Sequence, residues 1–127
     1  MDVVILSGGF DPVHDGHIRM FRSAALKYDK VFVGLNSDDW LTRKKGAAFM
    51  PFDVRKNILE SIKYIDFVYS FDDSDDTAIE LINDMNHNWG DIVSTITFGN
   101  GGDRKNGNYP ELDFCRDLDI LIDDDIG

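Results

Sequence analysis

Short apolar runs alternate with amphipathic segments along this 127-residue chain. Residues 3–7 form a short β-branched, apolar run of the kind that fills a buried parallel strand. Over residues 16–28, apolar side chains recur at spacings of three and four, which is the period of an amphipathic helix. Strands that are separated by helices form a parallel sheet with right-handed crossovers, covered on both faces. The alternation therefore predicts an α/β fold.

The same alternation continues along the chain and predicts five strands in all. The predicted strands cover residues 3–7, 30–36, 66–71, 91–98 and 118–123. The predicted helices cover residues 16–28, 51–65, 76–86 and 109–117, and residues 40–51 are predicted to be a basic connection. Because no internal repeat, low-complexity tract or linker interrupts the pattern, residues 1–127 are expected to form one domain with a doubly wound, five-stranded parallel sheet.

The charge and cysteine content restrict the possible partners. The net charge of −11 argues against binding to nucleic acid or to an anionic membrane surface, so an anionic ligand must enter through a local positive patch. Cys115 is the sole cysteine and cannot form an internal disulfide or a thiolate metal site. The sequence also has no apolar run of 18 residues and no secretory N-terminus. A cytoplasmic location is therefore predicted.

Residues 8–20, GGFDPVHDGHIRM, connect the first predicted strand to the first predicted helix. In a doubly wound sheet, ligands bind beyond the carboxyl ends of the strands, where the strand order reverses. Gly8 and Gly9 permit a close approach of the backbone to a ligand, or a positive φ. The helix that begins near Gly16 presents unpaired N–H groups and the positive end of its dipole. This junction is expected to bind phosphate.

His14 and His17 lie at the same helix entrance. Each imidazole can donate a charge-assisted hydrogen bond to a phosphate oxygen without the permanent charge of a lysine. A single histidine in such a place is more often an ordinary turn or surface residue. Two of them beside glycines, at the junction of a strand and a helix, favour the phosphate-binding interpretation.

Residues 8–20 resemble the HxGH signature of the cytidylyltransferase-like nucleotidyltransferases. The similarity continues through residues 33–46 (VGLNSDDWLTRKKG) and 55–68 (RKNILESIKYIDFV), and weakly through 98–104 (FGNGGDR). The nearest likeness is to heptose-phosphate adenylyltransferases and glycerol-3-phosphate cytidylyltransferases. The resemblance implies a Rossmann-like fold and an enzyme that joins a nucleoside triphosphate to a sugar phosphate or polyol phosphate, with release of pyrophosphate.

The resemblance also implies roles for individual residues. His14 and His17 would hold the triphosphate and stabilise its transition state, and Lys44 would neutralise the reacting phosphates. Lys45 remains an alternative because the register of the basic run, residues 43–45, is uncertain by one residue. For both lysines the alternative to a functional role is a place in a solvated surface loop. Arg55 would lie near the phosphates, although a surface ion pair explains it nearly as well.

The remaining predicted contacts concern the nucleotide and the second substrate. The residues expected to contact the nucleotide are Gly8, Gly9, Phe10, Gly16, Gly101, Gly102 and Asp103. Asp11, Asp38 and Lys45 are expected to contact the phosphorylated substrate. Magnesium is expected to arrive with the triphosphate, so no dedicated metal site in the protein is predicted. Residues 72–76 (DDSDD) are predicted to be a solvated turn, with Asp76 capping a helix, and Trp40, Met20 and Phe49 are assigned to apolar faces.

The C-terminus departs from the family pattern. Related enzymes continue past the fifth strand into a Ser/Thr-rich phosphate-contacting motif and a final helix, whereas this sequence stops at LIDDDIG, residues 121–127. Either the chain is a truncated piece or catalysis is impaired. The sequence therefore leaves two functions open, a nucleotidyltransferase and a non-catalytic nucleotide-binding module. The resemblance to the family implies a homodimer. The GGD sequence of residues 101–103 favours ATP over CTP as the nucleotide.

Overall fold

Five parallel strands form one sheet in the order β3-β2-β1-β4-β5 in the computed structural model, which describes residues 1–100 and 109–126. The strands are β1 (Asp2–Gly8), β2 (Lys30–Leu35), β3 (Phe67–Ser70), β4 (Thr95–Gly99) and β5 (Leu121–Asp123). The helices are α1 (Asp15–Lys27), α2 (Asp38–Lys45), α3 (Phe52–Glu60), α4 (Ile79–Trp89) and α5 (Pro110–Asp117). The predicted doubly wound α/β sheet is confirmed.

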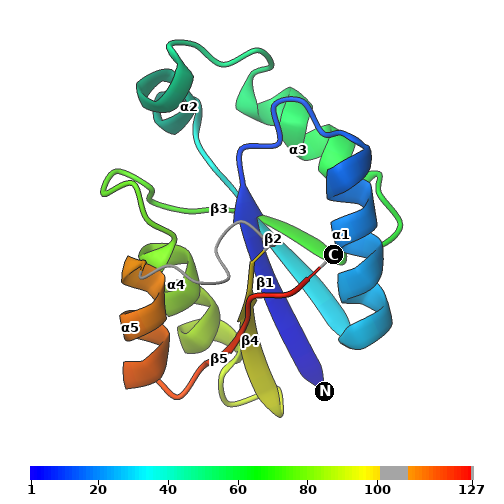
Figure 1. Ribbon diagram of the computed structural model, residues 1–127, viewed down its shortest axis with the longest axis vertical. Coiled ribbons are helices and arrows are strands. Elements are labelled where there is room, and N and C mark those ends of the chain that lie inside the picture. Colours follow the sequence, from blue (N-terminus) through cyan, green and yellow to red (C-terminus); the bar gives the residue numbers. More distant parts are fainter. Residues whose placement is uncertain (101–108, 127) are drawn as a thin grey trace.

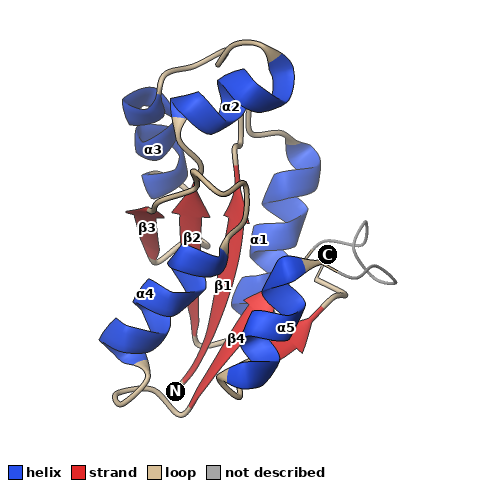
Figure 2. Cartoon of the chain, turned by 90° about the vertical axis from the view of Figure 1, so that its left-hand side faces the viewer, coloured by secondary structure: helices blue, strands red, loops and turns tan. Residues whose placement is uncertain are grey.

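The chain reverses direction across the sheet at β1. It first steps outward from β1 to β2 and β3, and then returns through α4 to β4 on the other side of β1. The register runs from Val3 opposite Lys30 to Gly8 opposite Leu35 on one side, and pairs Ile5 with Phe98 on the other. The carboxyl ends of β1 and β4 therefore form the switch point at which doubly wound sheets bind ligands. Figure 2 shows the strands running toward the end of the molecule that carries α2.

Helices cover both faces of the sheet, as Figure 1 shows, with α1 and α3 on one side and α4 and α5 on the other. Alternate residues of β1 enter the two cores: Val3 and Ile5 pack toward α4 and α5, while Val4 and Leu6 pack toward α1 and α3. All four side chains are buried, as expected of a central parallel strand. Within residues 1–100 and 109–126, no helix is long and apolar enough to cross a bilayer.

The basic segment predicted to be a connection contains a helix, α2, and this part of the prediction is wrong. Ser37 caps its N-terminus by accepting a hydrogen bond from the backbone N–H of Trp40, and Gly46 ends it in the left-handed conformation with φ of 92°. Acidic residues fill the first turn and basic residues the last, which suits the helix dipole. Leu41 is the only buried residue of α2, so the helix has a weak apolar period. The sequence signal for α2 lies in its capping residues and in the charges of its first and last turns.

Other boundaries also differ from the sequence-based expectation. α3 ends at Glu60, five residues early, and the carboxylate of Asp66 then accepts a hydrogen bond from Val31 N as the chain enters β3. β4 starts only at Thr95, because residues 91–94 continue α4 as a turn in which Val93 N donates to Trp89 O. Phe49, predicted to pack in a core, is 74% exposed.

Candidate functional site

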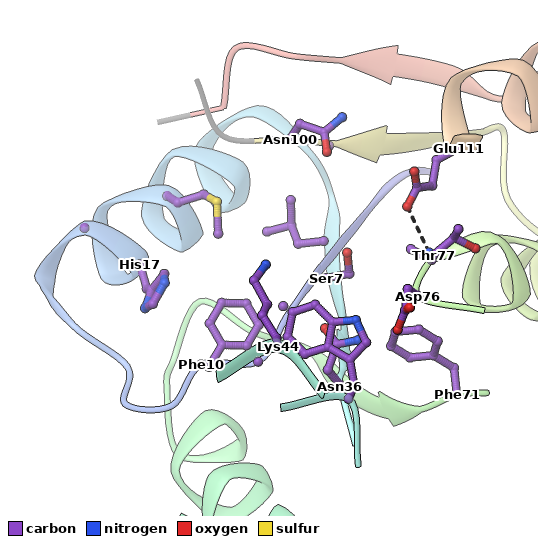
Figure 3. Close-up of a pocket in the computed structure, with 18 of the residues that line it drawn as sticks. Ser7, Phe10, His17, Asn36, Lys44, Phe71, Asp76, Thr77, Asn100 and Glu111 are labelled. Atoms are coloured by element: carbon purple, nitrogen blue, oxygen red, sulfur yellow. Dashed lines mark hydrogen bonds between the residues drawn. The ribbon is translucent and has the colours of Figure 1, made fainter. Parts of the chain in front are cut away.

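A cavity of about 520 Å³ lies at the switch point of the sheet. Its walls come from the carboxyl ends of β1, β2 and β4, the N-terminus of α1, the inner face of α2, the segment that precedes α4, and the first turn of α5. Figure 3 shows side chains from these elements converging on one space. The volume falls within the range of small-molecule sites. Of the residues predicted to contact phosphate, the cavity is lined by Gly8, Gly9, Phe10, His14, Gly16, His17 and Lys44.

His14 and His17 cap helix α1 reciprocally. Nδ1 of His14 accepts a hydrogen bond from the backbone N–H of His17 at 3.4 Å, and Nδ1 of His17 accepts from the backbone N–H of His14 at 3.2 Å. The two rings stack with their centroids 3.7 Å apart. Because each Nδ1 is an acceptor, the proton of each neutral ring lies on Nε2. The cap therefore fixes the tautomer that leaves an Nε2–H donor on each ring.

Burial lowers the pKa of His17, and the neighbouring His14 lowers it further. A neutral ring is the form that the capping hydrogen bond requires, because a protonated Nδ1 cannot accept. Phe10 supports this ring, since its own ring is buried and meets that of His17 edge to face at 4.9 Å. His17 is consequently held in place by the rings of Phe10 and His14.

The glycines of this junction act mainly through their lack of a side chain. A Cβ at Gly8 would lie 2.9 Å from the ring of Phe10, and a Cβ at Gly9 would lie 2.7 Å from a methyl group of Leu41. Of the two alternatives expected for these glycines, a positive φ is found at neither. The left-handed conformation falls on Phe10 instead, with φ of 48°.

The three cations of the basic run have different partners. Arg43 pairs with Asp76 at 2.9 Å, and Lys45 pairs with Asp11 at 2.8 Å. Lys44 lies in the last turn of α2, lines the cavity, and makes no ion pair with a described residue. Figure 3 shows its side chain extending into the space. The structure thus separates Lys44 from Lys45, which the sequence left as alternatives.

Arg55 is fully buried and does not line the cavity. Its guanidinium donates to the carbonyl oxygens of Gly9, Asn36 and Met50 at 2.8–2.9 Å, and to the carboxylate of Asp38 at 2.6 Å. These partners are the segments that follow β1 and β2 and the residues that precede α3. Arg55 therefore joins the loops behind the cavity wall, and the surface ion pair considered as its alternative is wrong, since the guanidinium is not at the surface.

The carboxylate of Asp11 is also engaged within the protein. It accepts hydrogen bonds from the backbone N–H groups of Phe49 and Met50 at 2.6 and 2.7 Å, and it pairs with Lys45. Burial on its own raises the pKa of Asp11, but these donors together hold that pKa below its ordinary value of 3.8. Asp11 and Asp38, both predicted to contact the phosphorylated substrate, thus each have a protein partner, and neither lines the cavity.

The acidic segment 72–76 is not simply a solvated turn, so that prediction is wrong. Asp73 is buried, and its carboxylate accepts hydrogen bonds from the side chains of Asn36 and Ser37 at 3.0 and 2.7 Å. Asp76 does not cap α4. The Thr77 hydroxyl accepts from the N–H of Ile79 instead, while Asp76 pairs with Arg43. This segment thus attaches α2 to the chain before α4.

Several residues that line the cavity were not singled out from the sequence. Asn36 and Asn100 directly follow β2 and β4, so a polar residue at the end of a buried strand was the available signal. Trp40 was assigned to the core but lines the cavity, as does Met20. Glu111 is buried and accepts a hydrogen bond from Ala78 N at 2.9 Å, for which no sequence signal exists.

Gly101, Gly102 and Asp103, predicted to contact the nucleotide, lie outside the described residues. Over residues 1–100 and 109–126, no group of three or more histidine, cysteine, aspartate or glutamate side chains is arranged to hold a metal ion. The prediction that the protein provides no dedicated metal site remains a prediction.

The fold and the site define a doubly wound α/β domain with a cavity suited to an anionic ligand at its switch point. The family model described as cytidylyltransferase-like matches residues 5–100. The chain belongs to the cytidylyltransferase-like family.

Individual relatives agree with this assignment. The bifunctional protein HldE of Sulfurimonas denitrificans is 32% identical over 122 residues, which is 94% of this chain and 23% of that protein. The chain thus spans about a quarter of the length of that bifunctional relative. Glycerol-3-phosphate cytidylyltransferase of Bacillus subtilis is 37% identical over 68 residues, which is 54% of this chain and 53% of that protein.

A solved structure shares the fold. The lipopolysaccharide core biosynthesis protein of Thermoplasma volcanium superposes with a TM-score of 0.73 at 19% identity, covering 97% of this chain and 93% of that one.

Proposed function

We propose that this chain is a nucleotidyltransferase that transfers a nucleotidyl group from ATP or CTP to a sugar phosphate or polyol phosphate and releases pyrophosphate. One observation carries the proposal: the same cavity at the switch point is lined by the N-terminus of α1, by His14 and His17, and by Lys44. These groups all favour bound phosphate. Membership of the cytidylyltransferase-like family supports the same reaction.

The reaction needs no covalent intermediate on the protein. An oxygen of the acceptor phosphate attacks the α-phosphorus of the triphosphate, and the bond from that phosphorus to the bridging oxygen of the β-phosphate breaks. The electron pair of this bond leaves with pyrophosphate. Catalysis therefore consists of aligning two anions in line and stabilising the charge that grows on the leaving group.

The residues around the cavity suit these tasks. His14 and His17 would donate from Nε2 to oxygens of the triphosphate, and their reciprocal cap holds both rings in the donating tautomer before the ligand arrives. Lys44 would neutralise charge on the β- and γ-phosphates from the last turn of α2. Gly9 and Gly16 also line the cavity, so their backbone groups would be available to the phosphates.

Magnesium is part of the proposal only as a companion of the triphosphate. The carboxylates that line the cavity are Asp76 and Glu111, of which the first pairs with Arg43 and the second accepts from Ala78 N. With two carboxylates already engaged, the described residues do not fit a dedicated cage for the ion. Magnesium characteristically keeps several waters and binds through substrate phosphates, which agrees with this arrangement.

The preferred nucleotide in this proposal is ATP, with a heptose-phosphate-like acceptor. Support comes from the 32% identity to the bifunctional protein HldE and from the resemblance of the GGD sequence at residues 101–103 to heptose-phosphate adenylyltransferases. We expect isothermal titration to show tighter binding of ATP than of CTP. Tenfold tighter binding of CTP would contradict this choice and favour a glycerol-3-phosphate cytidylyltransferase.

A pyrophosphate-release assay over a panel of sugar phosphates and polyol phosphates, with ATP and with CTP, tests the reaction itself. We expect release with at least one acceptor, and a loss of release in Lys44→Met. Nucleotide binding without pyrophosphate release under any acceptor would instead assign the chain to the non-catalytic nucleotide-binding modules.

A further inference from the structure

We propose that Trp40 is a positioning residue for Lys44, with its indole face holding the lysine ammonium over the cavity. The inference rests on the proposed function, because it concerns how the cation that meets the triphosphate is kept in place. Nζ of Lys44 lies 4.6 Å from the centroid of the Trp40 ring, within the range of a cation–π contact. The two residues are four apart on α2 and so share one face of the helix.

Lys44 needs such support because little else restrains it. Its side chain is exposed, and a lysine ammonium sits on a flexible four-carbon stem. Arg43 and Lys45 are each tied to a carboxylate on a neighbouring loop, whereas Lys44 has no ion pair within the part of the chain that the structure describes. In a protein of net charge −11, an unrestrained ammonium would sample many positions outside the cavity.

Trp40 is itself held firmly, which makes it a suitable platform. Its backbone N–H donates to the Ser37 hydroxyl at 3.1 Å in the N-terminal cap of α2. Its ring lies close to Gly9, where an added Cβ would lie 3.4 Å from the indole and 2.7 Å from a methyl group of Leu41. Because Gly9 belongs to the segment after β1, the indole is seated on the same segment that leads to His14 and His17.

The strength of the contact suits a positioning role. A cation–π contact leaves the N–H donors of the ammonium free to form charge-assisted hydrogen bonds to phosphate, so the contact persists when the triphosphate binds. The indole therefore preorganises Lys44 without trapping it. Loss of the indole is expected to weaken phosphate binding by about two- to fivefold, the ratio that corresponds to an exposed cation–π contact.

The binding of inorganic tripolyphosphate, measured by isothermal titration, tests the coupling between the two residues without a known acceptor. We expect Trp40→Leu to weaken binding about two- to fivefold, Trp40→Phe to restore part of that loss, and Lys44→Met to weaken binding more than Trp40→Leu. In the Lys44→Met background, Trp40→Leu should have no further effect. Equal losses from Trp40→Leu in both backgrounds, or no loss in either, would overturn the inference.

A second measurement uses the folded wild-type chain and does not depend on activity or on a stable Trp40→Leu variant. A cation held over the indole face places the ε-methylene protons of Lys44 in the ring current, so we expect an upfield NMR shift that Trp40→Phe alters and that persists when tripolyphosphate binds. An unshifted Lys44 in the wild type would overturn the inference. If the shift and the coupling are present but the wild type releases no pyrophosphate, the proposed reaction fails while the positioning role stands.

Discussion

At the scale of single residues, His14 and His17 serve the helix and the site at the same time. Each ring accepts a capping hydrogen bond through Nδ1, and this same bond leaves Nε2–H as the donor for a ligand. A substitution at either position therefore removes a helix cap together with a phosphate contact. The stability effect and the catalytic effect must be measured separately.

His17→Ala is expected to lower the catalytic rate by about 2–4 kcal/mol of transition-state stabilisation, as for one preorganised donor. It should also lower the free energy of unfolding by about 1 kcal/mol, because the acceptor of the cap is lost. His17→Glu is the matched variant, since a glutamate at this position can accept the hydrogen bond from His14 N but repels phosphate. We expect His17→Glu to unfold at a denaturant concentration close to that of the wild type while losing turnover as strongly as His17→Ala. Wild-type rates of pyrophosphate release in either variant would contradict the role of His17.

The lowered pKa of His17 predicts how stability depends on pH. The unfolded chain titrates near the ordinary value of 6.5 and the folded chain at a lower pH, so below 6.5 the unfolded state binds more protons. The stabilising contribution is thus complete above pH 6.5 and is lost as the pH falls through the lower, folded pKa. Urea unfolding between pH 7.5 and 5 should show a larger loss of stability in the wild type than in His17→Gln, which cannot titrate. Parallel pH profiles would show that this ring is not held in its neutral form.

At the scale of elements, α2 is the part of the site that depends most on its attachments. It is fastened at Arg43 to the segment that carries Asp73 and Asp76, and at Lys45 to Asp11. It buries only Leu41, so packing contributes little to its position. The position of α2 beside the cavity therefore relies strongly on the polar contacts of Arg43 and Lys45.

Arg43→Gln is expected to lower kcat/KM severalfold while changing the free energy of unfolding by less than about 1 kcal/mol, since the Arg43–Asp76 pair is exposed. Lys30→Gln is the matched control. It removes a similar exposed pair, with Asp66, at the amino end of β2, away from the carboxyl ends of the strands that form the cavity. Hydrogen exchange of the α2 amides should accelerate in Arg43→Gln and stay unchanged in Lys30→Gln. Equal activity in the two variants would show that the attachment of α2 does not matter for the site.

At the scale of the whole molecule, the net charge of −11 repels an approaching triphosphate. Cations beside the cavity must therefore make the local electrostatic potential positive. The position of a cation should then matter more than its contribution to the net charge. Lys27 is a poor control for this test, because its ammonium pairs with Asp123 of β5. Arg22 is exposed on α1 and does not line the cavity.

Lys44→Met and Arg22→Met each remove one positive charge. We expect a large rise in the KM for the nucleotide and a fall in kcat for Lys44→Met, with near wild-type values for Arg22→Met, measured at fixed ionic strength. Small and equal effects would indicate that the basic run of α2 only solvates an acidic surface.

Local patterns in the sequence determined the fold class and the position of the site. The β-branched run of β1 and the apolar period of α1 follow from short-range spacing, and the parallel sheet follows from their alternation. The phosphate-binding prediction at His14 and His17 needed only the order of strand, glycines and helix. In the structure both histidines line a cavity at this junction, and the binding of phosphate there stays a prediction.

Tertiary structure alone decided which of several similar side chains face the cavity. Arg43, Lys44 and Lys45 are consecutive in the sequence. Asp76 and Asp11 are placed so that Arg43 and Lys45 form ion pairs with them. The turn of helix α2 leaves Lys44 at the cavity. Tertiary structure also decides the partners of Arg55, whose buried guanidinium donates hydrogen bonds to carbonyl groups of loops distant in sequence. Spacing along a chain determines which side chains share a face of an element. Which partner a charged side chain finds depends on how distant segments pack. A buried charge must be hydrogen-bonded or paired, and only the fold brings the necessary groups within hydrogen-bond distance.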